Sequence, residues 1–234
     1  MLIFAKNKED LGSKNKLKRF KENETFPNVI QPTREDLTEK EFYLKGRWNK
    51  EFFKNENPIV LELGCGKGEY SVGLAQRFPK KNFIGIDIKG ARFWRGAKTA
   101  VEEHITNVGF LRTQIELVEY AFDENEVDEI WITFPDPQIK YKRTKHRMTN
   151  SIFLQRYKKI LKSDGLVHLK TDSEFMHGYT LGLLHGEGHE VLYANHNVYR
   201  NEGSPDEVTA IQTFYESQYL EQNKPITYIR FKIK

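Results

Sequence analysis

Apolar positions along this chain follow two spacings from residue 59 onward. Continuous apolar runs such as Pro58-Ile59-Val60-Leu61 indicate buried strands, whereas apolar residues three or four positions apart indicate helices. The predicted strands are 59–63, 82–87, 108–111, 128–134, 165–171, 189–195 and 226–233. The predicted helices are 69–78, 90–104, 149–162, 174–185 and 209–221. This alternation predicts an α/β fold, with a mostly parallel sheet and helices on both faces.

The pattern before residue 59 is different. Residues 1–33 are polar and basic, and we expect a flexible extension that is poorly ordered until it is bound. The domain proper is expected at residues 34–234. Its first element is predicted to be a helix from Thr33 to Phe53, with Thr33 as N-cap and Asp36 in the first turn.

A glycine-rich turn joins the first predicted strand to its helix. Its sequence is Glu62-Leu63-Gly64-Cys65-Gly66-Lys67-Gly68, with three alternate glycines. Glycine permits positive φ and lets a ligand lie against bare backbone. The next strand ends in Asp87, and in nucleotide folds an acid about 20 residues past the glycines holds ribose hydroxyls. A tight turn that only packs helix on strand would not require this acid.

The spacing of the glycines distinguishes between cofactors. A dinucleotide fingerprint reads G-x-G-x-x-G and places a pyrophosphate at the helix N-terminus. This chain has E-x-G-x-G-x-G, with Glu62 before the first glycine. An acid there repels a pyrophosphate but suits a cationic ligand without phosphate. The pattern therefore favours S-adenosylmethionine over a nicotinamide cofactor.

The composition of the chain argues against several classes of protein: disulfide-linked, metal-binding, membrane-bound and secreted. The 234 residues carry a net charge of +4 and one cysteine, Cys65, which excludes disulfides and multi-cysteine zinc sites. The histidines show no metal-ligand spacing, so no metal is predicted. No apolar run has membrane-spanning length and no signal-peptide core is present, so we expect a cytoplasmic protein without membrane contact.

The fourth predicted strand leads into a rigid turn and then a basic run. Phe134-Pro135-Asp136-Pro137 holds an aspartate between two prolines, at the strand end where doubly wound folds bind ligands. Residues 140–147 follow with five Lys/Arg, one histidine and no acid. Cations with an interleaved Tyr141 suit an RNA backbone and unstacked bases. The alternative is an exposed turn followed by solvated surface.

Two further acids follow later strands. The fifth strand ends in Lys170-Thr171-Asp172, which places a second carboxylate on the same rim. Thr213-Phe214-Tyr215-Glu216 offers a third. Its alternative reading is a capping box that only starts a helix.

These motifs together resemble one family. The glycine loop, Gly85-Ile86-Asp87, Phe-Pro-Asp-Pro with its basic run, Lys-Thr-Asp and Thr-x-x-Glu occur in this order in bacterial tRNA (guanine-N7-)-methyltransferases, and the likeness runs from about residue 30 to the end. The resemblance implies a seven-stranded Rossmann-like methyltransferase sheet with one antiparallel C-terminal strand beside the fifth. It implies methyl transfer from S-adenosylmethionine to guanine N7 in the tRNA variable loop, with S-adenosylhomocysteine as product.

The resemblance also implies roles for individual residues. Asp136 is implied as the catalytic residue at the reaction centre. The cofactor-binding residues are Glu62, Gly64, Gly66, Gly68, Asp87, Gln114 and Asp136. The substrate- and RNA-binding residues are Lys140, Lys142, Arg143, Lys145, His146, Arg147, Asp172, Thr213 and Glu216.

Four positions depart from the family pattern. Thr133 stands where the family usually has asparagine, Gln138 where tryptophan follows the turn, Arg143 in place of a histidine, and Gln114 in place of an acid. Three alternatives stay open from sequence: a nicotinamide-dependent oxidoreductase, a non-catalytic RNA-binding module, and a methyltransferase acting on another RNA. The oligomeric state is open between monomer and homodimer.

Overall fold

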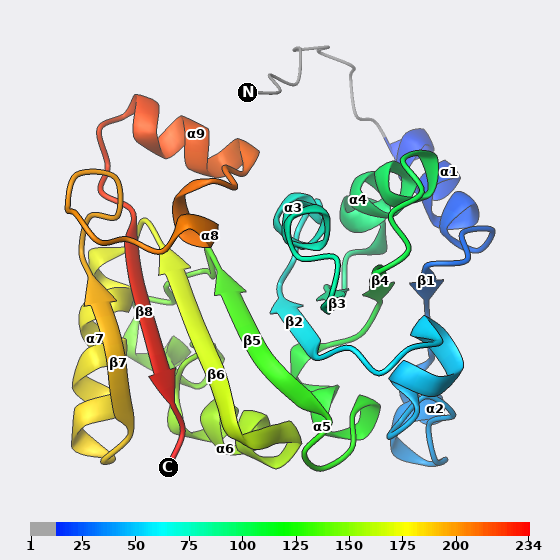
Figure 1. Ribbon diagram of the computed structural model, residues 1–234, viewed down its shortest axis with the longest axis horizontal. Helices are drawn as coiled ribbons and strands as arrows, with labels where there is room; N and C mark the ends of the chain where they lie inside the picture. The colour runs from blue at the N-terminus through cyan, green and yellow to red at the C-terminus, as the bar shows by residue number, and fades with distance from the viewer. Residues whose placement is uncertain (1–12) are drawn as a thin grey trace.

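A computed structural model describes residues 13–234 as one mixed sheet with helices on both faces (Figure 1). The sheet has eight strands in the order β1-β4-β3-β2-β5-β6-β8-β7. The strands are β1 (Val29–Ile30), β2 (Ile59–Leu63), β3 (Asn82–Ile86), β4 (Val108–Leu111), β5 (Val127–Thr133), β6 (Leu161–Thr171), β7 (Glu190–Asn195) and β8 (Thr227–Lys232). The seven expected strands are present, and the two-residue β1 beside β4 makes the eighth.

The strand directions confirm the predicted topology. From β1 to β6 every neighbouring pair is parallel, while β8 runs antiparallel between β6 and β7. All residues of β2, β3 and β4 are buried, as expected for parallel strands covered on both faces. The carboxyl ends of the parallel strands therefore meet at one edge, called the carboxyl edge below.

Nine α-helices are described in residues 13–234. They are α1 (Ser13–Asn23), α2 (Arg34–Thr38), α3 (Glu69–Arg77), α4 (Gly90–Glu102), α5 (Val118–Ala121), α6 (Ser151–Ile160), α7 (Glu174–Gly186), α8 (Asp206–Thr209) and α9 (Phe214–Glu221). Short 3-10 helices η2 (Ile115–Leu117) and η3 (Tyr141–His146) and a π-helix η1 (Trp48–Phe53) complete the set. Among the helices described, none is long and apolar enough to span a membrane.

The predicted helix from Thr33 to Phe53 is wrong beyond its first turn. Thr33 caps α2 and forms a capping box with Asp36, as expected, but α2 ends at Thr38. Gly46 then adopts a φ of 69°, which breaks helical geometry. Trp48 is drawn into the core instead, where its ring stacks on Phe122 at 5.2 Å. Tertiary packing of aromatic side chains thus overrides the local helical pattern.

The basic N-terminal segment carries structure within the described residues. Residues 13–33 contain α1 and β1, and α1 packs beside α4 (Figure 1). The buried Asn23 side chain at the end of α1 donates to the Gly90 carbonyl at 2.9 Å. Residues 1–12 lie outside the described part, and a separate unit at 1–33 stays a prediction.

The helix expected at 209–221 begins later than predicted. Thr209 is the last residue of α8, and α9 begins at Phe214 because Thr213 accepts a hydrogen bond from the backbone amide of Glu216 and caps the new helix. Figure 1 shows α9 above the carboxyl edge, at the end to which the parallel arrows point.

Candidate active site

The glycine loop (residues 64–68) has the backbone geometry that the sequence predicts. Gly64, Gly66 and Gly68 have φ values of 75°, 56° and 74°. A Cβ at Gly68 would lie 2.5 Å from the Phe110 ring, so this glycine serves packing. A Cβ at Gly64 or Gly66 would meet nothing closer than 4.0 Å. These two glycines leave bare backbone facing open space, which is the cradle a small ligand requires.

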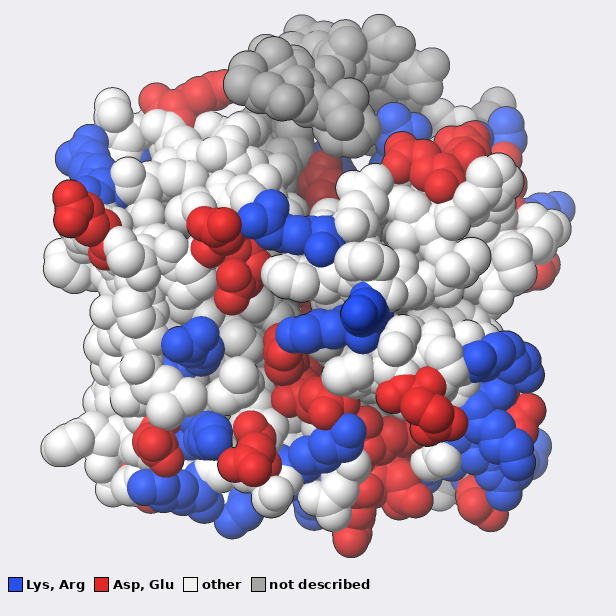
Figure 2. All heavy atoms as spheres, viewed as in Figure 1, with Lys and Arg blue, Asp and Glu red and all other residues white. Residues whose placement is uncertain are grey.

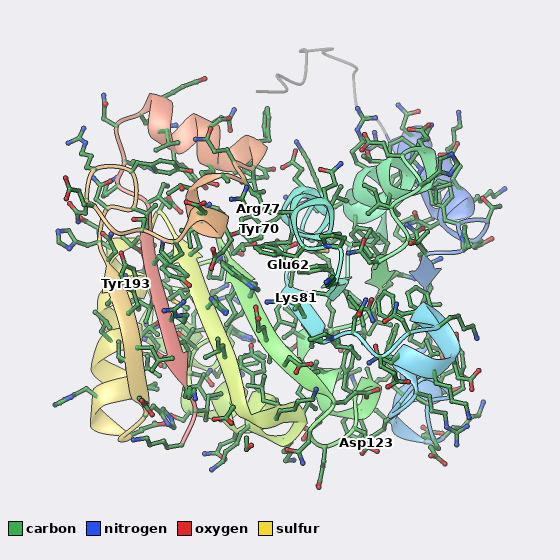
Figure 3. All side chains as sticks on the ribbon, in the orientation of Figure 1. Glu62, Tyr70, Arg77, Lys81, Asp123 and Tyr193 are labelled. Atoms are coloured by element: carbon green, nitrogen blue, oxygen red, sulfur yellow. The ribbon has the colours of Figure 1, made fainter. Side chains whose placement is uncertain are left out.

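Glu62 lies behind this loop, buried at the end of β2 (Figure 3). One carboxylate oxygen accepts from both the backbone amide and the hydroxyl of Ser71 in α3. The other accepts from the Thr133 hydroxyl at the end of β5, at 2.6 Å. Burial raises the pKa of Glu62 to about 7. Glu62 therefore joins the start of the cofactor-side helix to the strand that leads to Asp136.

Asp87 and Gln114 follow β3 and β4 on the carboxyl edge. The Asp87 carboxylate accepts from the Gly66 amide at 3.1 Å and from the Lys89 amide at 2.8 Å. It thus tethers the middle of the glycine loop to the next strand, where a ribose-binding acid is expected. Gln114 is exposed, and its side chain accepts from Arg34 at 3.1 Å.

Asp136 is exposed on a strained turn. Phe134 and Gln138, which flank it, have φ values of 48° and 47°. Such left-handed conformations of bulky residues cost about 1–3 kcal/mol each and cluster at functional sites. The Phe134 amide is held by the Lys170 carbonyl of β6 at 2.8 Å. The neighbouring strand thus holds the turn in a conformation that presents Asp136.

Tyr219 of α9 belongs to this site, although sequence reasoning did not select it. Its ring packs on Phe134 at 5.9 Å between centroids. Burial raises the pKa of Tyr219, and the carboxylates of Asp172 and Asp136 raise it further. These acids and the tyrosine therefore share one surface. The signal was present as Tyr215 and Tyr219, four residues apart on one helical face.

Asp172 stays on the rim. It is half-buried after β6, and its carboxylate lies 3.8 Å from the Lys224 ammonium, which in turn lies 4.9 Å from the Tyr219 ring.

Glu216 does not face the rim. It is fully buried, its carboxylate lies 2.7 Å from the buried Lys170 ammonium, and it accepts from the Tyr199 hydroxyl at 2.8 Å. It also completes the capping box with Thr213. Burial lowers the pKa of Lys170, and this carboxylate opposes that effect. The contacts described for its carboxylate are thus with Lys170, Tyr199 and the Thr213 backbone, and the guanine contact expected for Glu216 stays a prediction.

The basic run forms η3, with most of its side chains in solvent. Tyr141 is 92% exposed. The exposed cationic or titratable members are Lys140, Lys142, Arg143, Lys145 and His146.

Arg147 is the buried member of the basic run, and the RNA contact expected for it stays a prediction. It is 6% exposed and donates to the carbonyls of Gln138 and Ile139, both at 3.2 Å. Its guanidinium also lies 4.4 Å from the Tyr179 ring. Arg147 therefore anchors the segment after Asp136 to α7.

The face in Figure 2 carries Lys and Arg interspersed with Asp and Glu. A clustered, single-sign segment such as η3 is what an RNA backbone requires.

The chain matches a family model described as "Putative methyltransferase" over residues 56–229. A tRNA (guanine-N(7)-)-methyltransferase of Christiangramia forsetii is 77% identical over 224 residues, covering 96% of this chain and 100% of that protein. One from Porphyromonas gingivalis is 51% identical, covering 89% of this chain and 85% of that protein. The chain belongs to the tRNA (guanine-N(7)-)-methyltransferase family. It is thus an enzyme that transfers methyl groups.

Solved structures share the fold. The 16S rRNA methyltransferase KamB superposes with a TM-score of 0.60 at 12% identity, covering 79% of this chain and 92% of that one. A SAM-dependent methyltransferase from Aquifex aeolicus gives 0.51 at 16% identity, covering 94% and 98%. At these identities the likeness concerns the fold alone.

The residues present fit the cofactor that the family implies. The open backbone at Gly64 and Gly66 and the carboxylate of Asp87 adjoin one another through the 3.1 Å hydrogen bond. Within residues 13–234, no group of three His, Cys, Asp or Glu side chains is placed to hold a metal ion. The expectation of metal-free chemistry stays a prediction.

Proposed function

We propose that this enzyme transfers the methyl group of S-adenosylmethionine to N7 of a guanine in the variable loop of tRNA. The observation that carries the proposal is the position of Asp136. It is an exposed carboxylate on a strained turn, with the glycine loop linked to it through Glu62 and Thr133 and with η3 beginning at Tyr141, shortly after it. Cofactor, acid and cations thus adjoin one edge of the sheet.

The chemistry fits an acid and requires no base. Guanine N7 has a free lone pair, so no proton must leave before attack. S-adenosylmethionine supplies an electrophilic methyl group when it is bound. The chain's task is to orient N7 towards that group, which is catalysis by proximity.

Charge develops on the guanine ring as the methyl group is transferred. A carboxylate beside the ring stabilises that positive charge, and Asp136 is the exposed acid at the turn. Asp172 lies on the same rim, where its carboxylate accepts from the N–H donors of the guanine Watson–Crick edge. Tyr219, whose ring packs on Phe134 at the start of the Asp136 turn, is an aromatic side chain near which the purine binds.

The other residues of the site bind the cofactor or the tRNA and take no part in the methyl transfer itself. Gly64, Gly66 and Asp87 hold the cofactor, and Lys140, Lys142, Arg143 and Lys145 hold the phosphates of the tRNA backbone. Tyr141 stacks on an unpaired base. A cytoplasmic location and a monomer or homodimer remain predictions.

Substitution of Asp136 tests the assignment. We expect Asp136→Asn to lower the single-turnover rate by about 10²–10³-fold, the usual cost of losing one electrostatic stabiliser of the transition state. Cofactor affinity by calorimetry and tRNA affinity by filter binding should stay within about twofold of wild type, because one exposed carboxylate contributes little to either. A near-normal rate would remove Asp136 from the reaction centre.

A further inference from the structure

Helix α1 presents ammonium groups to solvent from a fixed position. Lys16, Lys18 and Lys21 are exposed on it. The one acid of the helix, Glu22, accepts from the indole nitrogen of Trp94 at 2.6 Å and lies only 3.9 Å from Lys18. Lys16 and Lys21 form no ion pair with any carboxylate of the described residues. The helix thus carries an excess of unneutralised positive charge.

Side-chain contacts hold α1 against α4 and against Arg112, which follows β4. The Arg19 guanidinium lies 4.6 Å from the Trp94 ring, and the Arg112 guanidinium lies 4.9 Å from the Phe20 ring. The buried Asn23 donates to Gly90, three residues after Asp87. The helix therefore ends beside the cofactor side of the carboxyl edge, with its lysines already oriented.

Helix α4 adds further positively charged side chains to the surface formed by α1. It has no acid before Glu102, and its exposed cations lie in its first two turns and just before it. Lys98 lies 5.2 Å from the Trp94 ring and is partly neutralised by the Glu102 carboxylate at 3.7 Å. We call this area the α1–α4 surface; its cations are Lys16, Lys18, Arg19, Lys21, Lys89, Arg92, Arg95 and Lys98.

We infer that the α1–α4 surface is a second contact for the tRNA backbone, distinct from η3 and on the other side of the site in the strand order. The inference rests on the proposed function, since it names where else the same substrate binds. Strand order places α4 between β3 and β4, whereas η3 connects β5 to α6. A folded RNA that reaches the carboxyl edge would therefore meet cations on both flanks.

The composition of α1 favours RNA over a lipid surface. A helix that lies in a membrane interface requires a free apolar face. Here Phe20 is covered by Arg112, and Leu17, 69% exposed, is the one large apolar side chain of α1 that is strongly exposed in the described part. Exposed lysines on a docked helix match phosphate binding through counterion release instead.

The test is a triple variant, Lys16→Gln, Lys18→Gln and Lys21→Gln, in the full chain. Glutamine keeps helix propensity while removing charge. A matched control, the amino-edge variant, replaces Lys50, Lys80 and Lys158 with glutamine; these lysines are exposed at the opposite end of the sheet. Filter binding measures the tRNA dissociation constant of each protein between about 50 and 200 mM salt.

If the three lysines contact phosphates, the slope of log affinity against log salt falls by about 2.1 to 2.7. The affinity ratio of wild type to variant then shrinks by about 20- to 40-fold across that salt range. Turnover at saturating tRNA and cofactor affinity stay at wild-type values, because no altered residue touches the site. The amino-edge variant keeps the wild-type slope.

Equal slopes in the two variants would overturn the inference while leaving the proposed function intact. Failure of the wild-type enzyme to bind or methylate tRNA would instead refute the proposed function. Sedimentation with phosphatidylglycerol vesicles is the companion measurement. Vesicle binding that depends on the three lysines, with an unchanged tRNA slope, would assign the surface to lipid and contradict the inference.

Discussion

The two carboxylate oxygens of Glu62 connect the cofactor loop to the reaction-centre turn. One oxygen holds Ser71 at the start of α3, and the other holds the Thr133 hydroxyl immediately before that turn. The family pattern has asparagine at position 133, which also offers a donor to this acid. Threonine at this position therefore preserves the hydrogen bond rather than breaking the site.

The pKa of Glu62 gives a prediction for stability. Its folded value of about 7 exceeds the ordinary 4.5, so between these pH values the folded chain holds a proton that the unfolded chain has lost. Wild-type stability should therefore lose up to about 1.4 kcal/mol per pH unit from this group as pH rises through that window. Glu62→Gln removes this loss, since glutamine does not titrate.

Urea unfolding of the wild-type protein and of Glu62→Gln at several pH values checks this predicted pH dependence of stability. The free energy of unfolding of Glu62→Gln minus that of wild type should increase as pH rises from about 5 to 7. A difference that is constant with pH would show that Glu62 is ionised in the folded state throughout.

Glu216 gives a second prediction. Removing one partner of a buried ion pair costs about 3–5 kcal/mol, and glutamine retains one acceptor for Lys170, so we expect Glu216→Gln to lower the free energy of unfolding by about 3 kcal/mol. The double variant Lys170→Met with Glu216→Leu should be more stable than Glu216→Leu alone, because it leaves no unpaired charge buried.

Urea unfolding and steady-state kinetics together decide the role of Glu216. A wild-type unfolding midpoint in Glu216→Gln, combined with a large loss of kcat/KM on tRNA, would contradict the buried pairing. It would return Glu216 to guanine recognition.

Helix η3 carries the most exposed cations next to Asp136, which predicts its contribution to binding. Replacing Lys142, Arg143 and Lys145 with glutamine should lower the salt slope of tRNA binding by about two to three. The amino-edge variant again serves as the control. An unchanged slope would mean that these side chains are solvated surface without phosphate contact.

Elements with strong local patterns were predictable from sequence. The strands from β2 to β8 consist of apolar or alternating runs, and the glycines required a turn between β2 and α3. The two residues of β1 are too few to produce a pattern. The helix expected up to Phe53 ends at Thr38, because Trp48 packs against Phe122, which lies far away along the chain.

The roles of single side chains were less predictable than the motifs. Asp172 and Glu216 look alike in sequence, but one stays on the rim and the other pairs with Lys170 in the core. Arg147 ends a basic run, yet it turns inward because Gln138 and Ile139 offer carbonyls. Such outcomes depend on contacts between distant segments, which local spacing does not encode.

In the molecule as a whole, the residues proposed to bind the cofactor and the guanine lie along the carboxyl edge of the sheet. Parallel strands bring the glycine loop, Asp87, Asp136 and Asp172 to the carboxyl edge, and α9 lies above it (Figure 1). Exposed cations lie on η3, which follows the Asp136 turn, and on α1 and α4. The arrangement suits a large anionic substrate whose reacting base enters the edge while its backbone lies across the flanks.

Mapping the methylated base on an unmodified tRNA transcript tests this account most directly. After incubation with S-adenosylmethionine, borohydride reduction and aniline cleavage reveal N7-methylguanine as a strand break. We predict one break, at a variable-loop guanine, and none in a transcript with adenine at that position. A methyl group at another position, or equal modification of both transcripts, would contradict the account.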